Sequence, residues 1–162
     1  MDEVKFLNRH QHGFVNGRST LTNLLETLES WTRLLDEGYG LDVAYLDFRK
    51  AFDTVSHRKL LERMRQYGFN GKIYGWIKEF LSSRQMRVLV NGKFSKWLEV
   101  LSGIPQGSVI GPLLFLIFVN EIPEWVKSSI KMFADDIKLW TKITGMEDSR
   151  ELQNDKQLGG AV

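Results

Sequence analysis

Hydrophobic residues in the first part of the chain recur at the spacing of an α-helix. Apolar side chains stand three and four positions apart in one row: Leu21, Leu24, Leu25, Leu28, Trp31, Leu34 and Leu35. Such a row lines one face of a helix. Ser19 or Thr20 can cap its start, and Gly38 can end it. The pattern therefore predicts an amphipathic helix between these capping signals.

Shorter apolar runs predict strands. The run from Leu41 to Phe48 is bounded by a glycine and a basic turn, which favours a strand with Asp47 near its C-terminal end. The runs 130–134 and 137–140 flank the pair Asp135-Asp136. We interpret this segment as a strand, an acidic turn and a second strand.

The middle of the chain alternates between helix signals and turn signals. Capping residues and apolar spacing predict helices over 56–68 and 71–83. The dipeptide Asn91-Gly92 stands between two apolar runs and favours a hairpin with a type I′ turn. Pro112 fits the first turn of a helix, and the apolar residues 113–120 after it are predicted to be helical.

The end of the chain is polar. From Thr141 onward we expect a tail with at most a frayed helix around Glu147 to Leu158, because the closing Leu-Gly-Gly-Ala-Val offers no core. The chain has 162 residues, of which 43% are hydrophobic. That length suffices for one hydrophobic core, so we expect one globular unit.

Composition excludes several classes of protein. Cysteine is absent, which excludes disulfides and thiolate zinc sites. The opening residues carry charge throughout, which excludes a secretory signal there. The longest apolar run, 113–119, is far shorter than the ~20 residues of a membrane span, so we expect no membrane contact. His10, His12 and His57 show no metal-ligand spacing, and we expect surface or capping roles for them.

Positive charge is concentrated in the middle of the chain. The net charge is only +2, yet the segment from Arg49 to Lys96 holds 12 Lys/Arg and 3 Asp/Glu, a local charge of +9. A basic surface of this kind suits nucleic acid, because each phosphate contact releases counterions. Solvated helix faces would give the same charge, so charge alone leaves both interpretations open.

Three carboxylates are candidate metal ligands. Asp47 at a strand end and the pair Asp135-Asp136 meet in space if their strands are neighbours in one sheet. Like charges that close raise one another's pKa unless a cation neutralises them. Oxygen ligands without His or Cys point to Mg²⁺ or Mn²⁺, and two such ions are typical of phosphoryl transfer. The alternative is an ordinary turn, because Asp-Asp pairs are common in turns.

A loop rich in glycine and proline, from Ser102 to Pro112, is a second candidate. It is either a plain connection or a backbone that approaches a ligand closely. In the second case Gly103 and Gly107 remove side-chain bulk, and Gln106 offers a donor and an acceptor.

Three long motifs, in a fixed order, resemble those of reverse transcriptases. YLDFRKAFDTVSH (Tyr45–His57) resembles the first palm motif, SGIPQGSVIGPLLFLIFVNEIP (Ser102–Pro123) the second, and FADDIKLW (Phe133–Trp140) the catalytic acidic hairpin. QHGFVNGRSTLTNL (Gln11–Leu24) resembles the segment before the palm in LINE-type elements. Phe-Ala-Asp-Asp and Ile-Pro-Gln-Gly favour the non-LTR retrotransposon branch.

The resemblance assigns roles to residues of the acidic site. It implies that Asp47 and Asp135 bridge two Mg²⁺ ions (or Mn²⁺), with the Phe48 backbone carbonyl and Asp136 as further ligands. One ion would activate the primer 3′-hydroxyl, and the other would hold the incoming triphosphate.

The resemblance also assigns nucleotide-binding roles. Phe52 falls where the family has an aromatic ring that excludes the ribose 2′-hydroxyl. The alternative is that Phe52 is an ordinary residue of the hydrophobic core. Gln106 and Gly107 match the loop that packs against the nascent base pair.

The fold implied by the resemblance is α+β: a right-hand polymerase palm, an antiparallel sheet backed by helices, with part of the fingers and no thumb. We expect partial fingers and a connecting helix over 1–40, the palm over 41–142 and a polar tail over 143–162. The implied partners are an RNA template, a DNA primer, dNTPs and the missing fingers and thumb segments. The implied location of the protein is inside the cell, and in the nucleus if the enzyme is active.

Two alternatives to an active polymerase remain. Because we recognise no basic fingers strand, primer grip or thumb, we expect the chain to be inactive in isolation. It could instead be a non-catalytic nucleic-acid-binding remnant of a decayed retrotransposon. A two-metal nuclease is a third reading, against which the Phe52 and Gln106 matches argue.

Overall fold

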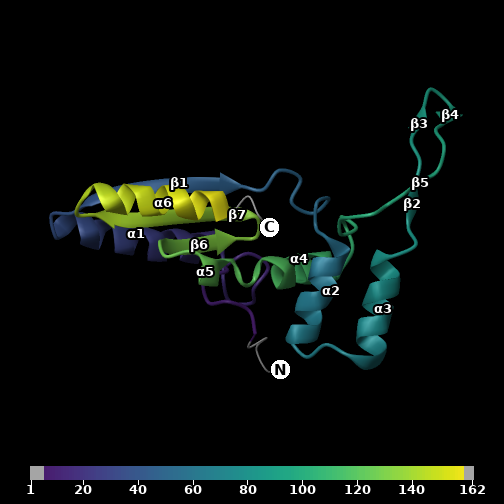
Figure 1. Cartoon of the computed structure of the whole chain (residues 1–162), viewed down its shortest axis with the longest axis horizontal. Helices are drawn as coiled ribbons and strands as arrows, with labels where there is room; N and C mark the ends of the chain where they lie inside the picture. The colour runs from purple at the N-terminus through teal and green to yellow at the C-terminus, as the bar shows by residue number, and fades with distance from the viewer. Residues whose placement is uncertain (1–5, 159–162) are drawn as a thin grey trace. The chain divides into compact units, whose positions relative to one another are not determined.

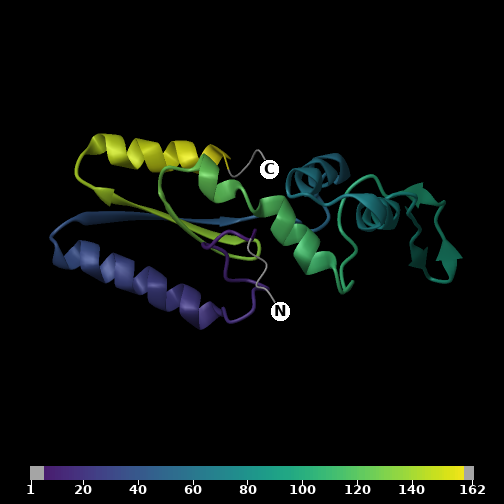
Figure 2. The ribbon, with the colours of Figure 1, turned by 90° about the horizontal axis from the view of Figure 1, so that it is seen from below.

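The chain folds as two compact units. Figures 1 and 2 show the computed structural model, which describes residues 6–158. One unit comprises residues 1–49 with 119–162, and the other comprises residues 50–118. The expectation of a single globular unit is therefore wrong, because the middle segment forms its own cluster of helices and turns.

A three-stranded antiparallel sheet is the centre of the first unit. Its strands are β1 (Gly40–Asp47), β6 (Ser129–Phe133) and β7 (Asp136–Ile143), in the order β1-β7-β6. The helices α1 (Thr20–Asp36) and α6 (Met146–Leu158) lie on opposite faces of this sheet (Figure 2). The two predicted strand regions are thus confirmed as neighbours in one sheet.

Helix α1 begins where the sequence predicted, but it presents an unexpected face to the sheet. The Ser19 hydroxyl accepts a hydrogen bond from the Thr22 backbone amide, and the Thr22 hydroxyl accepts one from the Ser19 backbone amide. The buried residues of α1 are Asn23 and Thr27. Most of the leucine row is instead exposed among the described residues: Leu21, Leu24, Leu25, Leu28 and Leu35.

Trp31 and Trp140 connect α1 to the sheet. Their rings meet edge to face, with centroids 6.2 Å apart and planes at 81°. Asn23 adds a polar contact, since its side-chain amide donates to the Met132 carbonyl over 3.1 Å and its oxygen accepts from Lys138 Nζ over 2.7 Å. A mixed polar and aromatic interface therefore holds the helix in place.

The segment predicted as a polar tail forms α6, a helix that packs against β7 and β1. Leu152 and Asp155 are buried. The Asp155 carboxylate accepts hydrogen bonds from the backbone amides of Lys127 and Ser128, at 3.1 and 2.8 Å. Burial of one leucine and of one carboxylate that accepts two hydrogen bonds makes the helix part of the unit, which composition alone did not indicate.

The N-terminal segment runs along the free edge of β6. Gln11 and Met132 form a parallel bridge, in which the His12 amide donates to the Met132 carbonyl and the Met132 amide donates to the His10 carbonyl. The short helix α5 (Ile122–Trp125) precedes β6. We expected a surface or capping role for His12, and the surface role is wrong because His12 is buried.

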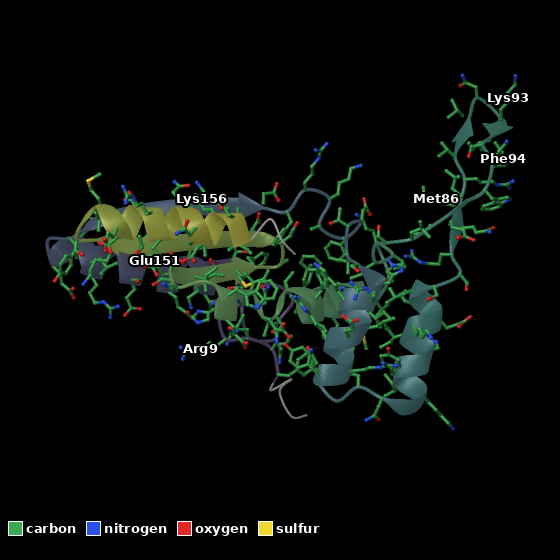
Figure 3. All side chains as sticks on the ribbon, in the orientation of Figure 1. Arg9, Met86, Lys93, Phe94, Glu151 and Lys156 are labelled. Carbon is green, nitrogen blue, oxygen red and sulfur yellow. The ribbon has the colours of Figure 1, made fainter. Side chains whose placement is uncertain are left out.

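The second unit consists of helices and a long hairpin. Its helices are α2 (His57–Gln66), α3 (Gly71–Leu81) and α4 (Gly111–Val119). Strand β2 (Gln85–Met86) pairs with β5 (Leu98–Glu99), and β3 (Leu89–Val90) pairs with β4 (Lys93–Phe94). Side chains of this hairpin, Lys93 and Phe94 among them, project outward from it (Figure 3).

Local signals in the second unit are confirmed. Ser56 caps α2 by accepting from the Lys59 amide. Asn91 and Gly92 both have positive φ, 49° and 75°, as the predicted type I′ turn requires. Between residues 6 and 158, no helix is both long and apolar enough to cross a membrane.

Candidate active site

The strand register gathers the predicted carboxylates at one end of the sheet. Asp47, the last residue of β1, is the direct cross-strand partner of Asp136, the first residue of β7. Asp135 precedes Asp136 in the turn between β6 and β7. Asp47 and Asp136 are exposed, and Asp135 is half-buried. The prediction that these segments would meet is confirmed at the level of the backbone.

Asp47 and Asp136 lie on the same face of the sheet, because directly opposed residues of an antiparallel pair do so. Along β7 that face continues through Lys138 and Trp140, which contact α1. Like charges placed directly opposite each other destabilise a strand pair. The backbone of this chain nevertheless holds two carboxylates opposite each other, with a third in the adjacent turn.

These carboxylates suit a hard divalent cation by their chemistry. They supply only oxygen donors, at an accessible sheet end, which is the ligand type of Mg²⁺. Within residues 6–158, however, no three His, Cys, Asp or Glu side chains are already grouped as a ligand set. The roles of Asp47, Asp135, Asp136 and the Phe48 carbonyl as ligands therefore stay predictions.

The turn that carries Asp135 has a specific backbone geometry. Phe133 and Asp136 are paired, so Ala134 and Asp135 form a two-residue hairpin turn. Ala134 has a φ of 55°, which side chains other than glycine rarely adopt. A Cβ at Gly13 would lie 2.3 Å from the Ala134 nitrogen, so Gly13 is required for this close approach.

Gln11 holds the same turn through its side chain. Its Oε1 accepts hydrogen bonds from the amides of Gly13 and Ala134, both at 2.8 Å, and its Nε2 donates to the Ala134 carbonyl at 3.3 Å. Gln11 was predicted only as part of a motif, and no role was assigned to it. Only its position at the start of Gln-His-Gly-Phe marked it in the sequence.

In the second unit, the loop of the second motif is held on the C-terminal part of the first motif. The Gly103 amide donates to the Val55 carbonyl, and the Ile104 amide donates to the Phe52 carbonyl, each at 2.8 Å. The Ser102 hydroxyl donates to the Asp53 carbonyl at 2.9 Å. The two motifs are thus joined by backbone pairing.

Gly103 is essential to this junction. Its φ is +88°, and a Cβ there would lie 2.7 Å from the Asp53 carbonyl oxygen. Gly107 also has a positive φ, +80°, but open space around it. Gln106 is exposed and lines a groove of about 770 Å³ together with Asp53 and the loop. Gly103 thus approaches the protein's own backbone at Asp53, and a close approach of the loop to a ligand stays a prediction.

Phe52 stacks on Phe115 of α4. The ring centroids are 4.7 Å apart and the planes differ by 18°. Phe52 is half-buried, whereas Phe115 is almost fully buried. One face of the Phe52 ring is therefore fixed by packing, and its role in sugar selection stays a prediction.

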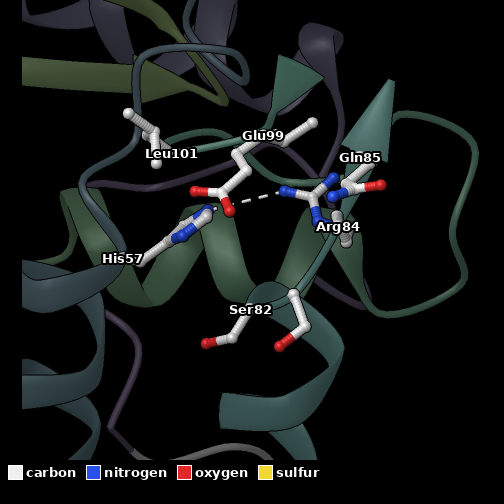
Figure 4. A pocket seen from close by; sticks show the side chains of 8 residues that line it. His57, Ser82, Arg84, Gln85, Glu99 and Leu101 are labelled. Carbon is white, nitrogen blue, oxygen red and sulfur yellow. Dashed lines mark hydrogen bonds between the residues drawn. The ribbon is translucent and has the colours of Figure 1, made fainter. Parts of the chain in front are cut away.

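His57 and Arg84 support the same loop. His57 Nε2 donates to the Gly103 carbonyl at 2.8 Å, and the Arg84 guanidinium donates to it at 2.6 Å. Figure 4 shows both side chains with Glu99 at a pocket of about 450 Å³. Burial lowers the pKa of Arg84. The sequence indicated only a surface or capping role for His57 and no role for Arg84, because the contact joins positions far apart in sequence.

Basic residues of the second unit are only partly solvated. The Arg63 guanidinium is buried and lies 5.0 Å from the centre of the Phe118 ring. Arg87 lies over two exposed rings of the hairpin, 3.7 Å from the centre of Phe94 and 4.4 Å from that of Trp97. Part of the basic segment thus serves packing, and part forms an exposed basic and aromatic hairpin.

Known proteins are similar to this chain over most of its length. The family described as "Reverse transcriptase (RNA-dependent DNA polymerase)" matches residues 1–154. "Probable RNA-directed DNA polymerase from transposon BS" of Drosophila melanogaster is 31% identical over 147 residues, which are 86% of this chain and 16% of that protein. "RNA-directed DNA polymerase from mobile element jockey" of the same species is 30% identical over 149 residues, 87% and 16% of the two chains.

A third relative has a lower coverage. "Retrovirus-related Pol polyprotein from type-1 retrotransposable element R2" of Popillia japonica is 33% identical over 104 residues, 64% of this chain and 17% of that protein. The chain therefore spans about one sixth of the length of these curated relatives.

The fold is similar to that of a solved polymerase. Apo telomerase from Candida tropicalis, truncated from its C-terminal domain, aligns with a TM-score of 0.63 and 13% identity over 91% of this chain and 32% of that chain. At this identity the likeness shows the fold alone. It confirms the predicted α+β right-hand polymerase fold.

Proposed function

Because the chain belongs to the reverse transcriptase family, we propose that it is the catalytic palm region of an RNA-directed DNA polymerase. The resemblance to non-LTR retrotransposon enzymes is confirmed by its relatives from mobile elements. The reaction proposed is transfer of a nucleotide from a dNTP to a primer 3′-hydroxyl on an RNA template. The observation that carries the proposal is the pairing of Asp47 with Asp136, beside Asp135 in the turn.

Asp47, Asp135 and Asp136 would hold divalent ions, with the Phe48 carbonyl as a further oxygen donor. Bound Mg²⁺ would supply charge stabilisation for the phosphoryl transfer. The chain's own contribution is positional: β1 and β7 keep carboxylates from two strands at one sheet end. That position costs electrostatic repulsion, which a bound cation would relieve.

The second unit would contact the incoming nucleotide. The ring of Phe52, fixed on one face by Phe115, would exclude a 2′-hydroxyl by its bulk. Gln106 and Gly107 would pack against the new base pair. Gly103 and its bonds to Val55, His57 and Arg84 hold the loop that carries them.

The proposed partners are an RNA template, a DNA primer and dNTPs, and the proposed location is the nucleus. A basic segment, with exposed Trp97 and Phe94 beside Arg87, supports nucleic-acid binding. The same observation favours a second candidate function, nucleic-acid binding without catalysis.

Primer extension separates the two candidates. The longest natural protein that includes this chain is assayed with an RNA template, a DNA primer, dNTPs and Mg²⁺, beside its Asp47→Asn and Asp135→Asn variants. Extension that depends on both carboxylates supports the polymerase. Retained template binding without any extension by the unaltered protein would contradict it and favour the binding function.

A further inference from the structure

The Gln11 side chain is buried at the back of the acidic turn. Its exposed fraction is 3%, and it comes from the N-terminal segment, far from Asp135 in sequence. Its amide meets both backbone polar groups of Ala134, accepting from the nitrogen and donating to the carbonyl. Asp135 follows Ala134 directly in the chain, so the Ala134 carbonyl belongs to the peptide bond that leads into Asp135. The side chain of Gln11 therefore fixes the peptide units from which Asp135 projects.

We propose that Gln11 is a positioning residue, which sets the backbone of the Ala134-Asp135 turn so that the carboxylates bind a divalent cation. The inference rests on the proposed function, since it takes Asp135 and its neighbours as the ligands. Gln11 does not touch the cation, so it acts only through the turn.

The turn needs such a support for two physical reasons. Ala134 has a positive φ of 55°, a conformation that costs free energy in a residue with a Cβ. In addition, the carboxylates of Asp135, Asp136 and Asp47 repel one another before a cation arrives. Both effects favour opening of the turn. The hydrogen bonds of the buried Gln11 amide oppose that opening. The turn is therefore already ordered before the cation binds, which lowers the entropy cost of binding.

Gln11 is itself held firmly. Its backbone pairs with Met132 of β6, and the Arg18 guanidinium donates to the Gln11 carbonyl at 2.7 Å. The Gly13 amide donates to Gln11 Oε1, which fixes the orientation of the side-chain amide. Gly13 has no Cβ to separate the two segments. The support is thus a built arrangement that includes Gln11, Gly13 and Arg18.

Glutamine meets the requirements at this position, and the side chains most similar to it do not. The side chain must accept at one atom and donate at another, at a fixed reach. Glutamate lacks the donor, and asparagine is one methylene shorter. Methionine has nearly the shape of glutamine but makes none of the three bonds.

Mn²⁺ binding to the purified chain tests the proposal, measured by electron paramagnetic resonance with Gln11→Met. The matched control is Asn120→Leu. Asn120 is another buried amide that holds the N-terminal segment, by accepting from the Asn8 amide and donating to the Phe6 carbonyl, both at 2.7 Å. Both variants lose buried hydrogen bonds, but only the first touches the turn. Circular dichroism and thermal unfolding report folding.

We expect both variants to unfold at a lower temperature and only Gln11→Met to lose Mn²⁺ affinity, by about 10- to 100-fold. Equal affinities in Gln11→Met and Asn120→Leu, with binding lost in Asp135→Asn, would overturn the positioning role alone. Unchanged binding in Asp135→Asn would overturn the metal site and the positioning role together.

A measurement on the unaltered chain decides the case if Gln11→Met does not fold. Without metal, the Ala134 amide should exchange its hydrogen slowly, because it donates to a buried oxygen of Gln11. Exchange of this amide as fast as that of an exposed loop would contradict the proposal.

Discussion

The ring of Phe52 lies almost parallel to that of Phe115, with centroids 4.7 Å apart. Removing the ring should therefore affect two properties. Phe52→Val should raise ribonucleotide incorporation relative to deoxyribonucleotide in the longest active protein that includes the chain, because the bulk beside C2′ is lost. It should also lower the unfolding free energy, since an aromatic pair adds about 1 kcal/mol beyond its buried area.

Competition assays with matched ribo- and deoxyribonucleotides measure the first effect. Phe80→Leu is the control, because it breaks the stack with Trp76 in the same unit (5.7 Å, 20°) and Phe80 is not one of the predicted nucleotide-binding residues. If both variants discriminate equally between ribonucleotides and deoxyribonucleotides, Phe52 serves only to pack the hydrophobic core.

Asp47→Asn and Asp135→Asn should abolish polymerisation while folding stays nearly unchanged. Asp47 is exposed, so its loss should change the unfolding free energy by no more than about 0.5 kcal/mol. Asp36→Asn, at the exposed end of α1, is the control for loss of one surface charge. Loss of solubility in the first two variants, with the control unaffected, would argue for a structural role.

The chain by itself should show no processive reverse transcription. Rate depends on alignment of the 3′-hydroxyl with the α-phosphate, and modest misplacement costs about 10²-fold. Among residues 6–158 we recognise no primer grip or thumb to provide that alignment. The assay uses purified chain, RNA template, DNA primer, dNTPs and Mg²⁺ or Mn²⁺ at low salt, with Asp135→Asn as background. Extension over many nucleotides above that background would contradict the expectation.

The exposed hairpin should contribute to nucleic-acid binding. Arg87→Ala removes a charge and the cation that lies over Phe94 and Trp97, so the affinity for a single-stranded oligonucleotide should fall and the salt dependence should weaken by about one unit of slope. Fluorescence anisotropy at several salt concentrations measures both. Lys142→Ala, which removes a cation over Tyr39 in the other unit, should change neither.

Stability should fall in mild acid. Burial lowers the pKa of His12 in the folded chain below its ordinary value of 6.5, despite the nearby Glu26. The unfolded chain therefore takes up the proton first, and stability decreases as pH falls through 6.5 toward the folded pKa. Thermal unfolding between pH 7 and pH 5 measures this, and His12→Asn should flatten the profile, with the remainder from His10. An identical profile in His12→Asn would contradict the assignment.

Elements with local signals could be predicted from the sequence. Ser19 and Ser56 cap their helices, and Asn91-Gly92 forms its turn, because the information lies within a few neighbouring residues. The meeting of Asp47 with the Asp135-Asp136 segment could be anticipated because both strands were visible and the family motifs were in order, whereas the register that pairs Asp47 with Asp136 was not predicted.

Elements that depend on partners far away in the chain could not be predicted from the sequence. The leucine row of α1 predicted a buried face, yet the buried residues of this helix are Asn23 and Thr27. The Asn23 side chain bonds to the Met132 carbonyl and to Lys138, which lie far away in the sequence. The burial of Asp155 and the contacts of Gln11, His57 and Arg84 each join positions widely separated in the chain. Hydrophobic periodicity carries no information about such pairs.

The sheet of the first unit is assembled from segments on either side of the second unit. On a ribosome, β1 emerges well before its central partner β7, and residues 50–118 lie between them. At about 5–20 residues per second, Asp47 waits several seconds for Asp136, while the second unit is continuous and can fold first. During that interval β1 has an unpaired edge, which can pair with other chains until β7 has been synthesised.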